Sequence, residues 1–187
     1  VYAILPGGDG TLWLGISNGD VYRYFVSSGE FRHVPCRVGG KNYKSKGLTV
    51  MHLDVHGRLW IGGRDGLKVY VLRGNFLEET DVLRGKALPD DMVNAIYEDS
   101  GKGRFWIGTR NGLYRIDELE KSMEHYTTKD GLPNNVVQSV LEDASGMLWL
   151  STDKGVSRLD MERRVFRNYS VVDGLSSNQF NSGACCF

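Results

Sequence analysis

Short runs of apolar residues recur along the chain, and each run is bounded by a turn that contains glycine. The runs are rich in β-branched and aromatic residues, and the first unit shows no helical period, so they predict β-strands. Between the second and third runs, Asn18-Gly19 supplies the positive φ that a type I′ hairpin turn requires. The first four predicted strands are Val1–Leu5, Thr11–Gly15, Val21–Phe25 and Phe31–Val34. We therefore expect a unit of four short antiparallel strands.

This unit is repeated, and one frame marks each copy. A glycine lies three residues before a tryptophan, and a second glycine lies six residues after it. All four tryptophans of the chain occupy this position, at spacings of 47, 46 and 43 residues. The frames consist of Gly10, Trp13 and Gly19; Gly57, Trp60 and Gly66; Gly103, Trp106 and Gly112; and Gly146, Trp149 and Gly155. Chance does not produce such a pattern, so the chain is a tandem repeat.

A period of about 40–50 residues that carries four strands is typical of a β-propeller blade. We expect an all-β fold: a β-propeller segment of about four four-stranded antiparallel blades plus the first strand of a fifth. The expected blades cover residues 1–44, 45–91, 92–135 and 136–178, and residues 179–187 begin a further blade. Each tryptophan is expected to pack between neighbouring blades, and the glycines to form turns. We interpret the frame as scaffold, because chemistry seldom needs four identical copies of a site.

Composition narrows the classes of function only slightly. The 187 residues are enough for one domain with a sizeable core. Lysine plus arginine balance aspartate plus glutamate at 23 each, which predicts no nucleic-acid partner. The three cysteines do not make a disulfide framework; three thiols are the simpler interpretation, and one long-range pair between Cys36 and Cys185 or Cys186 is the alternative. No apolar run is long enough to span a membrane, and we expect both ends to be cuts in a longer chain.

The repeat resembles that of a known family once its polar positions are included. Residues Val137–Leu159 and Val93–Ile116 follow the pattern of the two-component regulator propeller repeat, in which Glu-Asp precedes the turn and Leu-Trp-Ile-Gly-Thr follows it. The linker Lys129–Asn135 is similar to the Asp-Gly-Leu-Pro-x-Asn junction between such blades, and Asp173–Asn178 is a second copy. The first unit lacks the Glu-Asp pair, and the second keeps only Asp54.

In that family the propellers form the extracytoplasmic sensor of membrane-bound hybrid histidine kinases, which are common in gut Bacteroidetes. The resemblance implies a periplasmic, non-catalytic segment that detects oligosaccharides. It also implies that the segment signals to transmembrane and kinase domains of the same protein. Because the family's propellers contain more blades than this chain, we expect either a sensor fragment or a ring completed by self-association. No cofactor is expected.

Propeller geometry indicates where a ligand would bind. Turns between the second and third strands of a blade open on one face together with the junctions between blades, and we call this the first face. Its amide and charged side chains suit sugar hydroxyls, and its arginines suit a carboxylate or sulfate. The candidate ligand-binding residues are Asn18, Arg64, Asp65, Arg110, Asn111, Asn134, Asn135, Asp153, Lys154 and Asn178. Tyr2, Tyr97 and Tyr114 are candidates for stacking, and any single residue of these sets is also explained as an ordinary hairpin or core residue.

Catalysis is the less favoured class of function. The carboxylate pairs Glu98-Asp99 and Glu142-Asp143 repeat at strand ends before a turn, so turn capping explains them better than acid–base chemistry. The Asp-x-x-Gly-x-x-Trp spacing resembles the Asp-box of sialidase propellers, which is itself a structural turn. No metal site is expected, since no convincing ligand spacing occurs. The predicted function is a non-catalytic sensor; a protein-docking propeller is the alternative, and a carbohydrate-active hydrolase or lyase ranks last.

Overall fold

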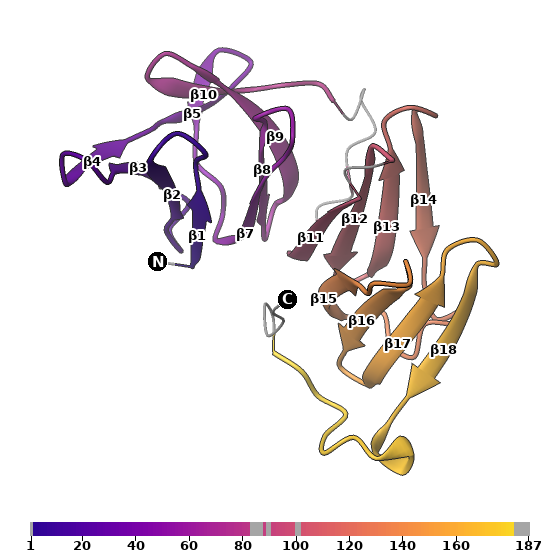
Figure 1. Ribbon diagram of the computed structural model, residues 1–187. Coiled ribbons are helices and arrows are strands. Elements are labelled where there is room, and N and C mark those ends of the chain that lie inside the picture. The colour runs from indigo at the N-terminus through magenta and orange to yellow at the C-terminus, as the bar shows by residue number, and fades with distance from the viewer. Residues whose placement is uncertain (1, 83–87, 89–90, 100–101, 182–187) are drawn as a thin grey trace. The chain divides into compact units, whose positions relative to one another are not determined.

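The computed structural model describes residues 2–82, 88, 91–99 and 102–181, and Figure 1 shows its ribbon. The chain forms two compact units, residues 1–93 and residues 94–187. Within the described ranges all regular structure is β-strand, apart from one 3₁₀ turn, η1 (Val171–Asp173). None of these residues forms a helix that could pass through a lipid bilayer.

The first unit contains two sheets, and sheet 1 is antiparallel with its four strands in chain order. These strands are β1 (Ala3–Pro6), β2 (Thr11–Gly15), β3 (Val21–Phe25) and β4 (Glu30–His33). Burial alternates along β2: Thr11, Trp13 and Gly15 are buried, whereas Leu12 and Leu14 are partly exposed. Sheet 1 therefore turns the face that carries Trp13 toward the core of the unit.

Sheet 2 contains the four strands of a blade and an added hairpin. Its strands lie in the order β6 (Lys41–Tyr43), β5 (Cys36–Val38), β10 (Phe76–Glu79), β9 (Gly66–Arg73), β8 (Leu59–Gly63) and β7 (Leu48–Leu53). The sequence predicted a loop over Gly39–Gly47, and here the structure differs. Gly39 and Gly40 both have positive φ, as a type I′ turn requires, and they close the β5–β6 hairpin. Strand β5 pairs in parallel with β10, which places Cys36 opposite Leu77 in the core.

Cys36 is a buried free thiol. Burial raises the pKa of Cys36 to about 12, so the thiol is protonated and a poor nucleophile at neutral pH. Cys185 and Cys186 lie outside the described residues.

The second unit contains two further antiparallel sheets with their strands in chain order (Figure 1). Sheet 3 consists of β11 (Val93–Asp99), β12 (Arg104–Thr109), β13 (Gly112–Asp117) and β14 (Ser122–Tyr126). Sheet 4 consists of β15 (Val137–Glu142), β16 (Leu148–Thr152), β17 (Gly155–Asp160) and β18 (Val165–Tyr169). The prediction of an all-β fold with four blade sheets is confirmed. Where the first strand of a fifth blade was predicted, residues 179–181 form no strand and residues 182–187 lie outside the described range.

Two of the four tryptophans, Trp13 and Trp106, lie where neighbouring sheets of a unit pack together. Trp13 joins Leu48 and Met51 of β7 in the core of the first unit. Trp106 joins Val137 and Val140 of β15 in the core of the second. Burying a tryptophan side chain removes roughly 200 Å² from water, which contributes about 5 kcal/mol of transfer free energy. The frame therefore supplies large apolar contacts between neighbouring blades.

In sheet 2, an aspartate before the turn holds the tryptophan to that turn. Asp54 Oδ1 accepts the backbone N–H groups of His56 and Arg58, at 2.9 and 2.8 Å. Its other oxygen, Oδ2, accepts the indole N–H of Trp60 at 2.8 Å. Burial raises the pKa of Asp54, but the hydrogen bonds from Trp60 and Arg58 outweigh it, and the pKa is lowered. One carboxylate thus fixes both the turn and the indole ring, and we call this arrangement the aspartate clamp.

Asp143 forms the same clamp in sheet 4. Its Oδ1 accepts the backbone N–H groups of Ser145 and Met147, at 2.9 and 3.1 Å. Its Oδ2 accepts the indole N–H of Trp149 at 2.7 Å. Hydrogen bonds from Ser145, Trp149 and Met147 hold the pKa of Asp143 well below its usual range. Asp143 therefore caps the turn, as the sequence predicted.

Sheet 3 lacks the clamp because its turn is one residue longer. Asp54 and Asp143 lie six residues before their tryptophans, whereas Asp99 lies seven residues before Trp106. Within the described ranges, Asp99 Oδ2 and Trp106 Nε1 are buried and have no hydrogen-bond partner. Lys102 Nζ lies 3.3 Å from Asp99 Oδ2 as an ion pair. Because of the additional residue, the buried indole N–H of Trp106 and the buried carboxylate oxygen of Asp99 do not form a hydrogen bond with each other.

Replacing Asp54 with asparagine should destabilise the protein by about 2–3 kcal/mol at neutral pH. One carboxylate oxygen would become an amide N–H₂ group, which cannot accept the hydrogen bonds that the turn N–H groups or the indole N–H donate. The folded-state pKa of Asp54 lies below the value of about 4 expected in the unfolded chain. The stabilisation is therefore present above about pH 4 and is lost as the pH falls through the folded pKa. Urea denaturation of both proteins measures the difference, which should shrink as the pH is lowered further below about 4. A difference that does not change with pH would contradict the clamp.

Deleting Gly101 restores the six-residue spacing between Asp99 and the tryptophan of sheet 3. We expect a gain in stability of about 1–2 kcal/mol, because the buried indole N–H of Trp106 acquires a charged acceptor. Urea denaturation measures the gain. The same deletion in a Trp106→Phe background is the control, since phenylalanine has no indole N–H. A gain of equal size in that background would show that the hydrogen bond is not its source.

Candidate functional site

On the first face of the first unit, Asp65 anchors the segment that precedes β7. Its carboxylate accepts hydrogen bonds from the Tyr43 hydroxyl, from Ser45 Oγ (2.7 Å) and from the Lys46 backbone N–H (3.0 Å). Burial raises the pKa of Asp65, but these hydrogen bonds outweigh it and lower the pKa. Asp65 is therefore ionised at neutral pH, with both oxygens committed to the fold. Its effect is to position Lys46 beside the β8–β9 turn.

The β2–β3 turn packs against the same segment. Gly19 has a φ of +90°, and a Cβ added there would lie 2.1 Å from the carbonyl oxygen of Ser45, so the close approach requires glycine. Within the turn, Asn18 Oδ1 accepts the N–H of Asp20 (3.1 Å), and Asn18 Nδ2 donates to Asp20 Oδ2 (2.9 Å). Lys44 Nζ also pairs with Asp20, at 2.9 Å. The amide of Asn18 therefore braces the turn.

A cavity of about 380 Å³ opens beside these turns, and we call it the basic cavity. It is lined by Tyr2, Ser17, Lys46, Gly47, Leu48, Thr49, Arg64 and Met92. Arg64 and Lys46 are exposed, and none of the lining residues is acidic. A Cβ added at Gly47 would lie 3.4 Å from Arg64 Cδ, so the Arg64 side chain extends directly over this glycine. Two cations beside a tyrosine ring that is 68% exposed suit an anionic ligand with a flat apolar surface.

In the second unit, the candidate asparagines hold the junctions that follow the blades. Asn135 Oδ1 accepts the backbone N–H of Thr128 at 2.8 Å. Asn178 Oδ1 accepts that of Val171 at 2.9 Å, which is the same seven-residue bridge in the next junction. Asn134 Oδ1 accepts a backbone N–H two residues ahead, at 2.7 Å. Each carbonyl oxygen is thus committed to the fold, and the amide nitrogens are the groups that remain for a ligand.

The β12–β13 and β16–β17 turns carry the other candidates. Arg110 and Lys154 are exposed, and their side chains make no hydrogen bond or ion pair with the rest of the described chain. Asn111 is exposed as well, whereas Asp153 Oδ1 accepts a hydrogen bond from Gln138 Nε2 at 2.7 Å. The second unit therefore presents one uncommitted cation on a turn of each of its sheets.

The three tyrosines considered for stacking differ in availability. Tyr2 is exposed and lines the basic cavity. Tyr114 is buried and stacks on the His125 ring, with 4.1 Å between ring centroids. The Tyr97 hydroxyl donates to Glu142 Oε2 at 2.8 Å, which joins sheet 3 to sheet 4. Of the three rings, that of Tyr2 is the one placed beside a candidate cation.

The basic cavity also contains residues that the sequence analysis did not select. Lys46 lies in it beside Arg64, with the hydroxyl groups of Ser17 and Thr49. The one signal in the sequence was a concentration of lysines in the glycine-rich segment before β7. Interpreted as a loop, that segment gave no reason to bring Lys46 to Arg64. The approach depends on the bonds of Asp65 to the segment, which link residues about twenty positions apart.

The carboxylates considered for chemistry have structural partners. Asp143 holds its turn and Trp149, and Glu142 accepts the hydroxyl of Tyr97. Nor, in the part of the chain that the structure describes, are three His, Cys, Asp or Glu side chains grouped as a metal ion would require. Asp143 and Glu142 are thus part of the scaffold.

Two stretches of the sequence, residues 87–111 and residues 131–154, match the family described as two component regulator propeller. They contain Trp106 and Trp149 and the first glycine of each of these two frames. The resemblance inferred from the sequence is thus confirmed for these two stretches. A comparison with curated protein sequences found no match.

Several solved structures share the fold. The extracellular domain of BT4673 of B. thetaiotaomicron, named as a hybrid two-component system, is 21% identical with a TM-score of 0.73, over 94% of this chain and 23% of that one. The extracellular domain of BT3049 of the same organism, named likewise, is 25% identical with a TM-score of 0.70, over 97% of this chain and 24% of that one. PorZ, a surface component of the type-IX secretion system of Porphyromonas gingivalis, is 17% identical with a TM-score of 0.69, over 95% of this chain and 28% of that one. The chain thus spans about a quarter of the length of these proteins.

Proposed function

We propose that this chain is a non-catalytic part of an extracytoplasmic sensor propeller and that it binds acidic oligosaccharides in the basic cavity. The observation that carries the proposal is the lining of that cavity. Arg64 and Lys46 supply two cations beside the exposed ring of Tyr2, and no lining residue is acidic. The family match and the extracellular domains that share the fold support a sensor role.

Each lining group has a role that fits a sugar acid. The guanidinium of Arg64 can hold a carboxylate or sulfate through two parallel hydrogen bonds, and Lys46 adds a point charge. The ring of Tyr2 offers a stacking surface to a pyranose. Ser17 and Thr49 place hydroxyl groups where sugar hydroxyls would lie. Recognition of this kind needs no chemistry on the ligand.

Signalling from such a site requires further domains. We infer that the full-length protein places this segment in the periplasm and continues into transmembrane and kinase domains. The family match and the name of BT3049 as a hybrid two-component system support this inference. Residues of both sheets of the first unit line the basic cavity, so a bound ligand would favour one packing of the two sheets over another. That preference is how binding would shift the population of the signalling state.

The substitution Arg64→Gln should weaken the binding of a uronic acid or sulfated oligosaccharide about 10- to 100-fold, because charge-assisted hydrogen bonds contribute about 1.5–3 kcal/mol. Isothermal titration calorimetry with acidic oligosaccharides and their neutral counterparts measures the effect. The affinity of the unmodified protein should also fall as salt is added, since the two cations are exposed.

Arg110 offers the matched control, because it occupies the equivalent position, two residues before the second glycine of its frame, in the other unit. The substitution Arg110→Gln should leave the affinity unchanged. An equal loss in both variants, or equal binding of neutral and acidic sugars, would contradict the basic cavity as the site. Turnover of any oligosaccharide by the purified chain would contradict the non-catalytic assignment.

We also propose that copies of the chain associate through sheet 1. The face of this sheet opposite Trp13 carries apolar side chains in register, with Ile4 beside Leu14 and Tyr24 beside Phe31. Ile4 and Phe31 are 60% and 64% exposed. An exposed apolar surface of this kind marks a protein contact. The same face favours the alternative function, a protein-docking platform with no small ligand.

Analytical ultracentrifugation at micromolar concentration should show a dimer for the unmodified chain and a monomer for the double substitution Ile4→Ser and Phe31→Ser. Val172→Ser is the control, because Val172 is 90% exposed but lies in η1, away from the sheet faces. A monomeric unmodified chain would contradict self-association. A dimer that survives the double substitution would place the contact on another surface.

A further inference from the structure

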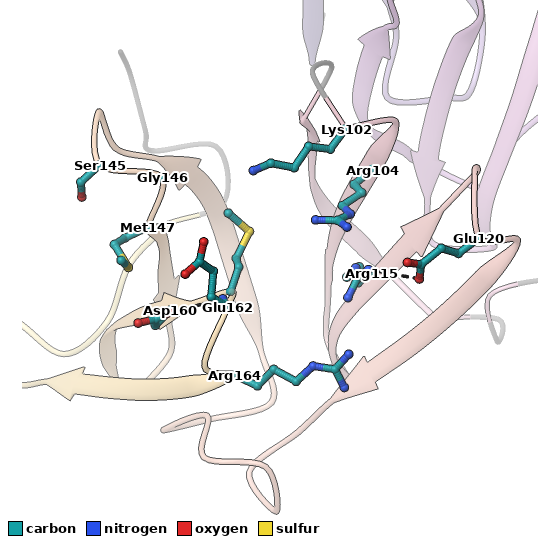
Figure 2. A pocket seen from close by; sticks show the side chains of 11 residues that line it. Lys102, Arg104, Arg115, Glu120, Ser145, Gly146, Met147, Asp160, Glu162 and Arg164 are labelled. Atoms are coloured by element: carbon teal, nitrogen blue, oxygen red, sulfur yellow. Dashed lines mark hydrogen bonds and ion pairs between the residues drawn. The ribbon is translucent and has the colours of Figure 1, made fainter.

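The second unit contains a cleft at the end of its blades opposite to the first face. The β11–β12 and β13–β14 turns of sheet 3 and the β15–β16 and β17–β18 turns of sheet 4 lie at this end, and the cleft has a volume of about 470 Å³. Figure 2 shows side chains of sheet 3 along one wall and side chains of sheet 4 along the other. None of the candidate residues selected from the sequence lines it.

The wall formed by sheet 3 is basic. Lys102 and Arg104 extend into the cleft (Figure 2). Arg104 donates its Nε to Asp117 Oδ2 at 2.9 Å, while its two terminal nitrogens have no partner within the described ranges. Arg115 lies deeper, 11% exposed, and is paired with two carboxylates at 3.0 Å each. Sheet 3 also contributes one exposed carboxylate, Glu120, which lies 3.7 Å from Arg115. Lys102 is paired with Asp99 at 3.3 Å, so the net positive charge that a ligand meets on this wall comes from Lys102 and the terminal nitrogens of Arg104.

The facing wall, formed by sheet 4, is acidic and apolar. Asp160 Oδ1 accepts the backbone N–H of Glu162 at 3.0 Å, which fixes the β17–β18 turn. Glu162 is exposed, and its carboxylate makes no hydrogen bond or ion pair with other described residues. The side chains of Met147 and Met161 line the cleft beside these carboxylates. Methionine adapts to apolar groups of varied shape, so this wall can accommodate an aliphatic or aromatic side chain.

Among the described residues, one ion pair ties the two walls together, and it uses Arg164, the cation that sheet 4 contributes to the lining. Arg164, in the β17–β18 turn, reaches Glu124 of β14 at 2.9 Å. The φ of Arg164 is +56°, in the left-handed region that residues other than glycine seldom adopt, so the turn is held in this shape by its surroundings. Across the described part of the cleft, the basic side chains of sheet 3 make no ion pair with Asp160 or Glu162. Apart from the Arg164–Glu124 pair, the cations of sheet 3 and the carboxylates of sheet 4 thus face each other across the cleft without forming an ion pair in the described residues.

We propose that this cleft binds a short zwitterionic peptide with apolar side chains. A simple anion would be repelled by the acidic wall, and a simple cation by the basic wall, whereas a dipolar ligand satisfies both. The peptide carboxylate lies at Arg104 and Lys102, its ammonium group lies at Glu162, and its side chains rest on the two methionines. The volume lies within the range of about 300–1,000 Å³ that is usual for small-molecule sites. This site is separate from the basic cavity and does not depend on it.

The test is a titration of the chain with the dipeptide leucyl-leucine, followed by NMR of ¹³C-labelled methionine methyl groups. The methyl signals of Met147 and Met161 should shift with one saturating curve. Those of Met51 and Met92, in the first unit, should stay in place. Leucyl-leucine that is acetylated at its amino group or amidated at its carboxyl group should bind at least tenfold more weakly, because one end loses its charge.

Substitutions in each wall test which end of the dipeptide that wall binds. Glu162→Gln should weaken binding of the free dipeptide about tenfold and abolish the preference for it over the acetylated form. Lys102→Gln should likewise weaken binding about tenfold and abolish the preference for the free dipeptide over the amidated form. The control is Lys129→Gln, since Lys129 is exposed in the junction between β14 and β15 and does not line the cleft; it should leave binding unchanged.

Methyl signals that remain in place at millimolar dipeptide, or equal binding of the free and capped forms, would overturn the proposal. Shifts caused by an acidic oligosaccharide but not by the dipeptide would overturn it as well, and would identify the cleft as an anion site. Because Arg64→Gln should not alter dipeptide binding, failure here is distinguishable from failure of the basic cavity.

Discussion

The hydrogen bond between an aspartate carboxylate and a tryptophan indole N–H is the constraint that orients the frame tryptophan in two of the four blade sheets. In sheet 2, Asp54 accepts two turn N–H groups on one oxygen and the indole of Trp60 on the other. A local turn thus sets the orientation of an indole ring whose packing partners are distant in the sequence. Where the turn is one residue longer, Trp106 is still buried but its indole N–H has no described partner. Burial alone therefore places the ring, and the clamp adds a specific orientation.

A scaffold held in this way leaves the side chains between frame positions free to differ. In the first unit, Asp65 is one of these variable residues, and its hydrogen bonds hold the segment before β7 against the β8–β9 turn. The cavity that results is lined by two cations, Lys46 and Arg64. In the second unit, the turns at the opposite end of the blades set Arg104 and Glu162 on facing walls. The same architecture thus provides both proposed sites, one for an anionic ligand in the first unit and one for a dipolar ligand in the second.

Local features could be predicted from the sequence. Four blade sheets and turn capping by Asp143 followed from strand periodicity and turn chemistry, both of which act over a few residues. The β5–β6 hairpin was missed because its partner β10 is distant in sequence, although Gly39-Gly40 carried the turn signal. For the site, residue type and loop position led to Arg64 but not to Lys46. Residue type and loop position also could not reveal that the side-chain carbonyl oxygens of Asn135 and Asn178 accept hydrogen bonds within the junctions. Each bond joins residues seven positions apart, so it depends on how the junction folds.

The most direct test of the clamp compares the hydrogen exchange of two indole N–H groups, because Trp60 and Trp106 are equally buried, at 0% and 2% exposure. Exchange followed by NMR at neutral pH should be at least about tenfold slower for Trp60, whose N–H is bonded to a charged acceptor that contributes about 1.5–3 kcal/mol. The two rates should converge when Asp54 is replaced with asparagine. Equal rates in the unmodified protein would show that burial alone orients these rings and would contradict the account.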